Sequence, residues 1–143
     1  MCNSVEFLLE GSIHQVTFSD PGAELPLVTK DHGIRLVSWG RRHFETGELP
    51  IGGSVPREAI ESGDWARWDP VPVKIHVRCY MELDANKRSH WFDVPPLHML
   101  QGLVATHGPE QRVYVVTVPA THEQAAIHDR WPRMIEASPL FRQ

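Results

Sequence analysis

Prolines and glycines interrupt this chain at short intervals, and they limit how long any helix or strand can be. The 143 residues include 12 prolines and 10 glycines. Proline fixes φ and removes a backbone donor, whereas glycine favours turns, so both residues tend to end regular elements. The sequence therefore predicts short elements joined by many turns. At this length we expect one domain, residues 1–143, with a core of ordinary size.

Most of the uninterrupted segments have the pattern of β-strands. Residues 12–19 alternate between polar and apolar side chains, and residues 25–40 hold two apolar runs around the turn sequence DHG, which is typical of a hairpin. Residues 73–83, VKIHVRCYMEL, alternate over the longest stretch. This pattern predicts one strand with an apolar face and a polar face that carries Tyr80 and Glu82. Three further strands are predicted in HWFDV, HMLQGLVA and RVYVVTV.

Two segments have helix signals. In SVPREAIESG, Pro56 suits the first helical turn and Gly63 suits the stop. In PATHEQAAIHDRWP, Thr121 and Gln124 have the spacing of a capping box, which predicts a helix of about seven residues ending at His128. The fold class that follows is α+β, with a mainly antiparallel, barrel-like β-sheet and short helices.

Charge and composition exclude several classes of protein. The net charge of −4 argues against a chain that is basic all over, although it leaves room for a local basic groove. Two cysteines, Cys2 and Cys79, do not form a disulfide framework, and this usage favours a reducing cytoplasm. The first residues lack the basic region of a signal peptide, and no apolar run reaches the length of a membrane span. We therefore expect a cytoplasmic protein.

The most reactive candidate is Cys2, which directly follows Met1. Removal of Met1 would leave a free α-amine, with a typical pKa of about 7.7–8.0, beside a thiol with a typical pKa of about 8.5. Such a 1,2-aminothiol attacks an aldehyde twice, first through nitrogen and then through sulfur, and closes a thiazolidine ring. The same group would also serve as an N-terminal nucleophile that hydrolyses amides. The alternative is an ordinary small residue at a frayed terminus.

Two further side chains are candidates for proton transfer. His128 lies at the end of the predicted helix, where the helix dipole favours its charged form. Its alternative role is to cap the helix by binding the last carbonyl groups. Glu82 lies near the end of the predicted strand, which would hold its carboxylate rigidly. The alternative for Glu82 is a solvated residue on the polar face.

If basic and aromatic side chains converge in the fold, they would form a binding surface for single-stranded nucleic acid. The alternative is that the basic side chains are merely solvated and the aromatic side chains belong to the core. The basic candidates are Arg35, Arg41, Arg42, His43, Lys87, Arg88, Arg130 and Arg133, and the aromatic candidates are Trp39, Trp65, Trp68, Trp91 and Trp131. A metal site is not expected, because the 9 histidines form no HExxH motif and no CxxC pairs occur. We predict no cofactor.

Several stretches together resemble the SRAP family, the SOS-response-associated peptidase-like proteins. Residues 113–135, VYVVTVPATHEQAAIHDRWPRMI, resemble the family segment in which a strand and a short helix lead into His-Asp-Arg-Met-Pro; here residues 128–132 read HDRWP. The opening MC matches the family's start. SWG at residues 38–40 resembles its Trp-Gly strand, and RCYMELD at residues 78–84 resembles its Phe-Tyr-Glu-Trp strand, with Glu82 on the family glutamate.

This resemblance implies a sensor of abasic sites in single-stranded DNA that acts in the DNA damage response. Cys2 would crosslink to the ring-opened sugar aldehyde, while His128 and Glu82 would manage protons. The DNA strand would be held by Trp39, Arg41, Arg42, Arg57 and Arg130. The resemblance also implies a DNA-associated protein that is bacterial or phage-encoded. We expect a monomer, although the sequence leaves the oligomeric state open. The family's peptidase label reflects the removal of residues ahead of the cysteine.

The chain departs from the family pattern at two motifs. Cys-Gly-Arg of the family is replaced by Cys2, Asn3 and Ser4, and GGSVPRE, with Arg57 and Glu58, occupies the region of the Asn-Ala-Arg-x-Glu motif. Family members also continue well beyond the histidine motif, so we expect a compact or divergent member. Two alternatives stay open: a cysteine-dependent, self-processing peptidase, and a degenerate member that binds DNA or protein without chemistry.

Overall fold

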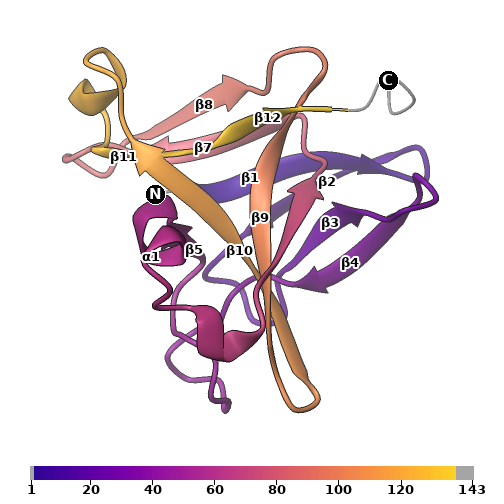
Figure 1. The fold of residues 1–143 in the computed structure, drawn as a ribbon. Coiled ribbons are helices and arrows are strands. Elements are labelled where there is room, and N and C mark those ends of the chain that lie inside the picture. Colours follow the sequence, from indigo (N-terminus) through magenta and orange to yellow (C-terminus); the bar gives the residue numbers. More distant parts are fainter. Residues whose placement is uncertain (1, 138–143) are drawn as a thin grey trace.

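The chain forms two β-sheets that enclose a shared core (Figure 1). A computed structural model describes residues 2–137. The first sheet has the order β2-β1-β7-β8, with β1 (Cys2–Leu9), β2 (Ser12–Thr17), β7 (Cys79–Leu83) and β8 (Ser89–Asp93). The second has the order β11-β10-β9-β6-β3-β4, with β3 (Glu24–Val28), β4 (Ile34–Ser38), β6 (Val71–Ile75), β9 (His98–His107), β10 (Glu110–Pro119) and β11 (Arg130–Pro132).

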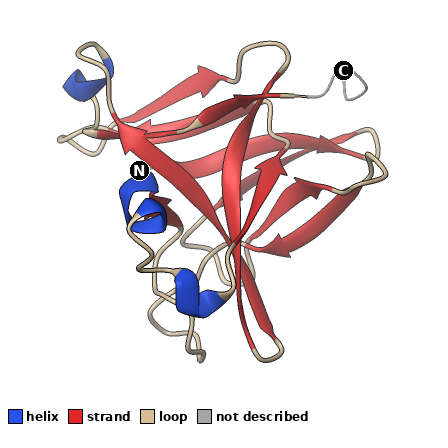
Figure 2. Ribbon diagram, in the orientation of Figure 1, coloured by secondary structure: helices blue, strands red, loops and turns tan. Residues whose placement is uncertain are grey.

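Two short strands complete the second sheet. β12 (Met134–Glu136) pairs with β9, and β5 (Ser54–Pro56) pairs with β10. The paired strands run antiparallel, except that β5 runs parallel to β10. Helical structure is limited to α1 (Arg57–Glu61) and the 3₁₀ turns η1 (Ala66–Trp68) and η2 (Gln124–Ala126), which lie outside the sheets (Figure 2). The expected mainly antiparallel β-fold with short helices is therefore confirmed.

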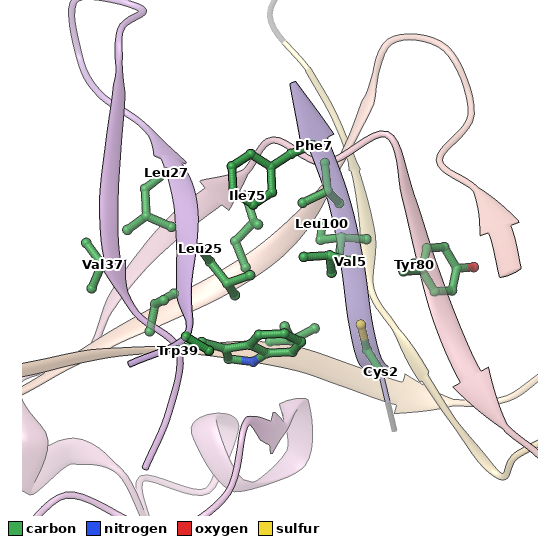
Figure 3. Close-up of a cluster of buried hydrophobic side chains, with 14 of the residues drawn as sticks. Cys2, Val5, Phe7, Leu25, Leu27, Val37, Trp39, Ile75, Tyr80 and Leu100 are labelled. Atoms are coloured by element: carbon green, nitrogen blue, oxygen red, sulfur yellow. The ribbon is translucent and has the colours of Figure 1, made fainter. Parts of the chain in front are cut away.

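The main core fills the space between the two sheets (Figure 3). The first sheet contributes Cys2, Val5, Phe7 and Tyr80, and the second contributes Leu25, Leu27, Val37, Ile75, Leu100, Val104, Val113 and Val115. A second cluster lies on the other face of β9 and β10, where Leu103, Tyr114 and Val116 pack under α1 and η1. The central strands of the second sheet are thus covered on both faces, which explains the continuous apolar runs in their sequences.

Several predicted elements are confirmed. Residues 25–40 form the β3–β4 hairpin, residues 12–19 contain β2, and the three later strand segments form β8, β9 and β10. None of the helices in residues 2–137 has the length and apolar character that crossing a membrane requires.

Residues 73–83 were predicted to form one strand, but the structure divides them between two strands. The first part is β6 in the second sheet, and the last part is β7 in the first sheet. Between them, the His76 amide donates to Pro26 and the Arg78 amide donates to Glu6, so the chain crosses from one sheet to the other. The buried face also differs, because Tyr80 and Glu82 point into the core. Alternation continued through the crossing, so the pattern did not reveal it.

The predicted helix ending at His128 is also wrong. Thr121 and Gln124 do form the capping box: the Thr121 amide donates to Gln124 Oε1 at 3.0 Å, and the Gln124 amide donates to Thr121 Oγ1 at 3.3 Å. Only the three-residue 3₁₀ turn η2 follows. Most side chains of this segment are exposed, so packing does not repay the cost of extending a helix. A helix dipole therefore does not act on His128.

Candidate active site

Backbone pairing between β1 and β7 positions Cys2 beside Glu82. The two residues are register partners, and a β-bulge lies between Cys2 and Ser4. The Cys2 thiol lies 3.6 Å from the Ser4 carbonyl oxygen, to which it donates. A bulge shifts one strand relative to the other and re-aims its side chains. Cys2 thereby turns into the core beside Tyr80 (Figure 3).

Both members of this pair are withdrawn from solvent. Cys2 is 1% exposed and Glu82 is 0% exposed. Burial raises the pKa of the Cys2 thiol, and the negative charge of Glu82 raises it further. Burial also raises the pKa of the Glu82 carboxyl, whereas the positive charge of the chain's amino terminus opposes that shift. Burial thus moves the pKa of both groups in the same direction, upward.

Tyr80 and Trp131 form a wall next to this pair. Trp131 Nε1 donates to the Tyr80 hydroxyl at 2.7 Å, and both side chains are buried. Burial raises the pKa of Tyr80 to about 12, and the charges of Glu82 and Cys2 add to this effect. The pair joins β7 to β11 and so fixes the HDRWP segment against the strand that carries Glu82. Trp131 is thus a buried part of this wall. The sequence alone did not show whether it would be buried or would stack on DNA bases.

His128 and the start of β1 line the same cavity. This cavity has a volume of about 490 Å³, and its lining includes Asn3, Asp84, His128 and Asp129. His128 is 33% exposed in its side chain, and its Nδ1 atom lies 3.2 Å from Asp129 Oδ1. The Arg130 amide donates to the same nitrogen at 3.1 Å. Asn3 and Leu83, which follow Cys2 and Glu82 in the chain, thus line the same cavity as His128, whereas the Cys2 and Glu82 side chains are buried behind it.

Two expected DNA-binding residues have structural positions instead. Trp39 is 0% exposed, and its Nε1 donates to the Gly53 carbonyl at 3.0 Å, so it offers no face to a base. Gly53 is required there, because a Cβ atom would lie 2.7 Å from the Phe18 ring. Arg42 is 3% exposed and donates to the Phe18 and Trp39 carbonyls and to Glu45. The assignment of Trp39 and Arg42 to DNA binding is therefore corrected.

Arg41 is also engaged in the fold. Its Nε donates to the Leu49 carbonyl and its NH1 donates to the Glu45 carbonyl, each at 2.7 Å. These bonds hold the loop that follows β4, so we assign Arg41 a structural role as well. Arg41 and Arg42 differ from ligand-binding arginines because their guanidinium groups donate to several backbone carbonyls. These contacts form only in the folded chain and cannot be read from the sequence.

Arg57 and Arg130 keep positions from which they can reach a ligand. Arg57 is 49% exposed in its side chain and pairs with Glu61 on the surface of α1. Arg130 donates to both Glu58 carboxylate oxygens, at 2.8 and 3.2 Å, and to the Thr117 carbonyl at 2.7 Å. Glu58 is therefore a further residue of interest, because its carboxylate occupies the fork that a phosphate group would use.

A separate basic cavity lies between the β3–β4 hairpin and β6. It has a volume of about 520 Å³, and Lys30, His32, Arg35 and Lys74 are among its lining residues. A local basic surface thus exists despite the acidic total charge. Its lining shares no residue with the cavity of His128.

Within residues 2–137, no group of three or more histidine, cysteine or acidic side chains is arranged to hold a metal ion. Comparisons with known proteins add no assignment: no protein-family model matches the chain, and a search of curated proteins found no match.

Proposed function

We propose that this chain captures abasic sites in single-stranded DNA by forming a covalent bond through Cys2, and that it has the SRAP fold. The observation that carries the proposal is the register pairing of Cys2 with Glu82, whose chain neighbours Asn3 and Leu83 line the cavity that His128 also lines. The resemblance to SRAP motifs predicts that these three residues act together. The pairing of Cys2 with Glu82, and the cavity shared by Asn3, Leu83 and His128, do not follow from positions in the sequence, and they therefore support the proposal.

The proposed reaction begins once Met1 is removed and the α-amine of Cys2 is free. The amine nitrogen attacks the aldehyde carbon of the ring-opened sugar and forms a carbinolamine. Loss of water gives an imine, and the thiol sulfur then adds to the imine carbon. The thiol proton moves to the nitrogen, so the product is a thiazolidine and one water molecule has been released.

Protons move to and from specific atoms in this sequence. Glu82 takes a proton from the Cys2 ammonium group, which frees the nitrogen lone pair, and returns it to the departing hydroxyl. Burial keeps the carboxyl pKa raised, so the group can carry the proton between these steps. His128 takes the hydroxyl proton at the sugar's anomeric carbon and donates a proton to the ring oxygen, which opens the ring to the aldehyde.

Contacts to DNA phosphates come from Arg57 and Arg130 in this proposal. Arg57 is exposed, and Arg130 exchanges Glu58 for a phosphate. Arginine binds phosphate through two parallel hydrogen bonds, which fixes orientation as well as affinity.

The experiment is incubation of the purified protein with a single-stranded oligonucleotide that carries one abasic site. We expect a protein–DNA adduct that survives heating in denaturing gel buffer, and we expect none with Cys2→Ala. Cys79→Ala is the matched control, since it removes the other cysteine and should react as the original chain does. Absence of the adduct together with hydrolysis of peptide substrates would instead support the peptidase alternative.

A further inference from the structure

A cavity distinct from that of His128 opens between the edges of the two sheets. It has a volume of about 570 Å³, and its walls come from β7, β8, the end of β10, the η2 segment and β11. The η2 segment separates it from the cavity of His128, since Gln124 lines only the former, Ala126 only the latter and Ile127 both. The proposed capture of DNA makes no use of this second cavity.

Aromatic rings form the interior of this cavity. Tyr80 and Phe92 stack with an interplanar angle of 29°, and Trp131 meets Phe92 edge to face at a centroid distance of 5.0 Å. The Trp131 nitrogen already donates to the Tyr80 hydroxyl, so these rings present mainly apolar surfaces. Val118, Ile127 and Met134 extend the apolar lining. An apolar side chain, or the face of a planar cation, fits such a site.

The charged residues of the cavity are all acidic. Asp93 from β8 and Glu123 ahead of η2 are exposed, and none of the lining residues among 2–137 is a lysine, arginine or histidine. Two carboxylates without a cation repel phosphate and attract a positive group. The site therefore excludes a DNA backbone and favours a ligand with basic side chains.

Beside the cavity, β8 forms the edge of the first sheet. In the part of the chain that the structure describes, β8 pairs with β7 alone. An edge strand presents unpaired backbone N–H and C=O groups, to which an extended peptide can add. A peptide in this position places alternate side chains toward the cavity, since side chains alternate across a strand.

From the free edge, the aromatic interior and the acidic rim together, we propose that β8 and this cavity bind an extended peptide segment of a partner protein. The segment alternates apolar with basic residues. It pairs with β8 through its backbone, inserts an apolar side chain against Phe92 and Trp131, and places a lysine or arginine near Asp93 and Glu123. The proposal is independent of the DNA chemistry.

Fluorescence polarisation with a labelled Val-Arg-Val-Arg-Val-Arg-Val peptide tests the proposal. We expect saturable binding that weakens at least about tenfold in the double variant Asp93→Lys/Glu123→Lys, because like charges then face each other. Asp20→Lys/Asp64→Lys makes the same change of charge at exposed sites outside the cavity lining and should bind as the original chain does. A peptide with glutamate in place of arginine, and one with glycine in place of valine, should both bind more weakly.

The backbone pairing is tested separately by two-dimensional NMR of the labelled protein. Addition of the peptide should shift the amide signals of residues 89–93, whereas those of β2, the other edge of the same sheet, should stay in place. Equal loss of binding in the two double variants would overturn the proposal, since it would indicate attraction by net charge alone. Absence of binding, or shifts confined to β2, would overturn it as well.

Discussion

Cys2 and Glu82 face each other across β1 and β7, and neither side chain is more than 1% exposed. A buried carboxyl group beside a thiol is an expensive arrangement that a purely structural pair would not need. Tyr80, also on β7, accepts a hydrogen bond from Trp131 of β11. The arrangement therefore has the features of a functional pair.

The first prediction concerns Glu82 and the pH dependence of stability. Burial raises the carboxyl pKa in the folded state above its unfolded value of about 4.3, so the folded chain binds more protons. Its contribution to stability is therefore complete below that unfolded value and is lost as pH rises through the folded pKa. Glu82→Gln carries no charge, so its advantage in free energy of unfolding over the original chain should grow from pH 4 to pH 8.

Urea denaturation at several pH values measures this difference. Glu24→Gln, at the exposed first position of β3, is the control, and its difference from the original chain should change little across the series. Parallel stability curves for Glu82→Gln and the original chain would contradict the assignment.

The second prediction concerns His128. His128→Ala should slow adduct formation by roughly 10²–10⁴-fold, the usual contribution of a general acid or base. Its circular dichroism spectrum and urea midpoint should remain close to those of the original chain, because the side chain is 33% exposed. His122→Ala removes an exposed histidine of the same segment and should retain the original rate. Rates that are equal in the two variants would remove His128 from the mechanism.

A third prediction separates core residues from DNA contacts. Trp39→Ala should lower the free energy of unfolding by about 3–5 kcal/mol, because it removes a fully buried ring and its hydrogen bond. Trp91, which is 42% exposed, gives the control: Trp91→Ala should cost much less. The readout is urea denaturation. A small cost for Trp39→Ala, comparable with that of Trp91→Ala, would contradict the core assignment.

Glu58 is the subject of the fourth prediction. Its carboxylate accepts hydrogen bonds from both terminal guanidinium nitrogens of Arg130, so Glu58→Gln should raise the affinity for single-stranded DNA a few-fold at low salt. The expected effect is modest, since the Glu58 side chain is 60% exposed and solvent screens such a pair. Fluorescence anisotropy with a labelled oligonucleotide measures it, and Asp64→Asn provides the same change of charge on an exposed residue. An equal gain in both variants would indicate net charge rather than release of Arg130.

The sequence predicted the strands well where alternation or apolar runs were long. β9 and β10 are bounded by turns and buried on both faces, so their composition identified them. The crossing between β6 and β7 was not predictable, because His76 and Arg78 fit an alternating pattern while their backbones bind different sheets. The helix predicted to end at His128 was too long, because a capping box indicates where a helix begins but not how long it is.

The candidate site was only partly accessible from the sequence. The motifs identified Cys2, Glu82 and His128 as candidates. Whether the Glu82 side chain points into the core, however, depends on the register of β1 against β7. A shift of one residue would turn that side chain to the other face. Likewise, Arg42 and an exposed arginine look the same in a sequence, whereas the carbonyl groups around Arg42 exist only in the folded chain.

The fifth prediction is also the most direct test of the central claim, that the Cys2 nitrogen and sulfur react together with an aldehyde. Intact-mass measurement should first show a chain without Met1. After incubation with an abasic oligonucleotide, the mass should rise by the mass of that oligonucleotide less one water, and heating should not reverse the change. Cys2→Ser should give no heat-stable product. A durable adduct of equal yield on Cys2→Ser, or no adduct on a chain that lacks Met1, would contradict the account.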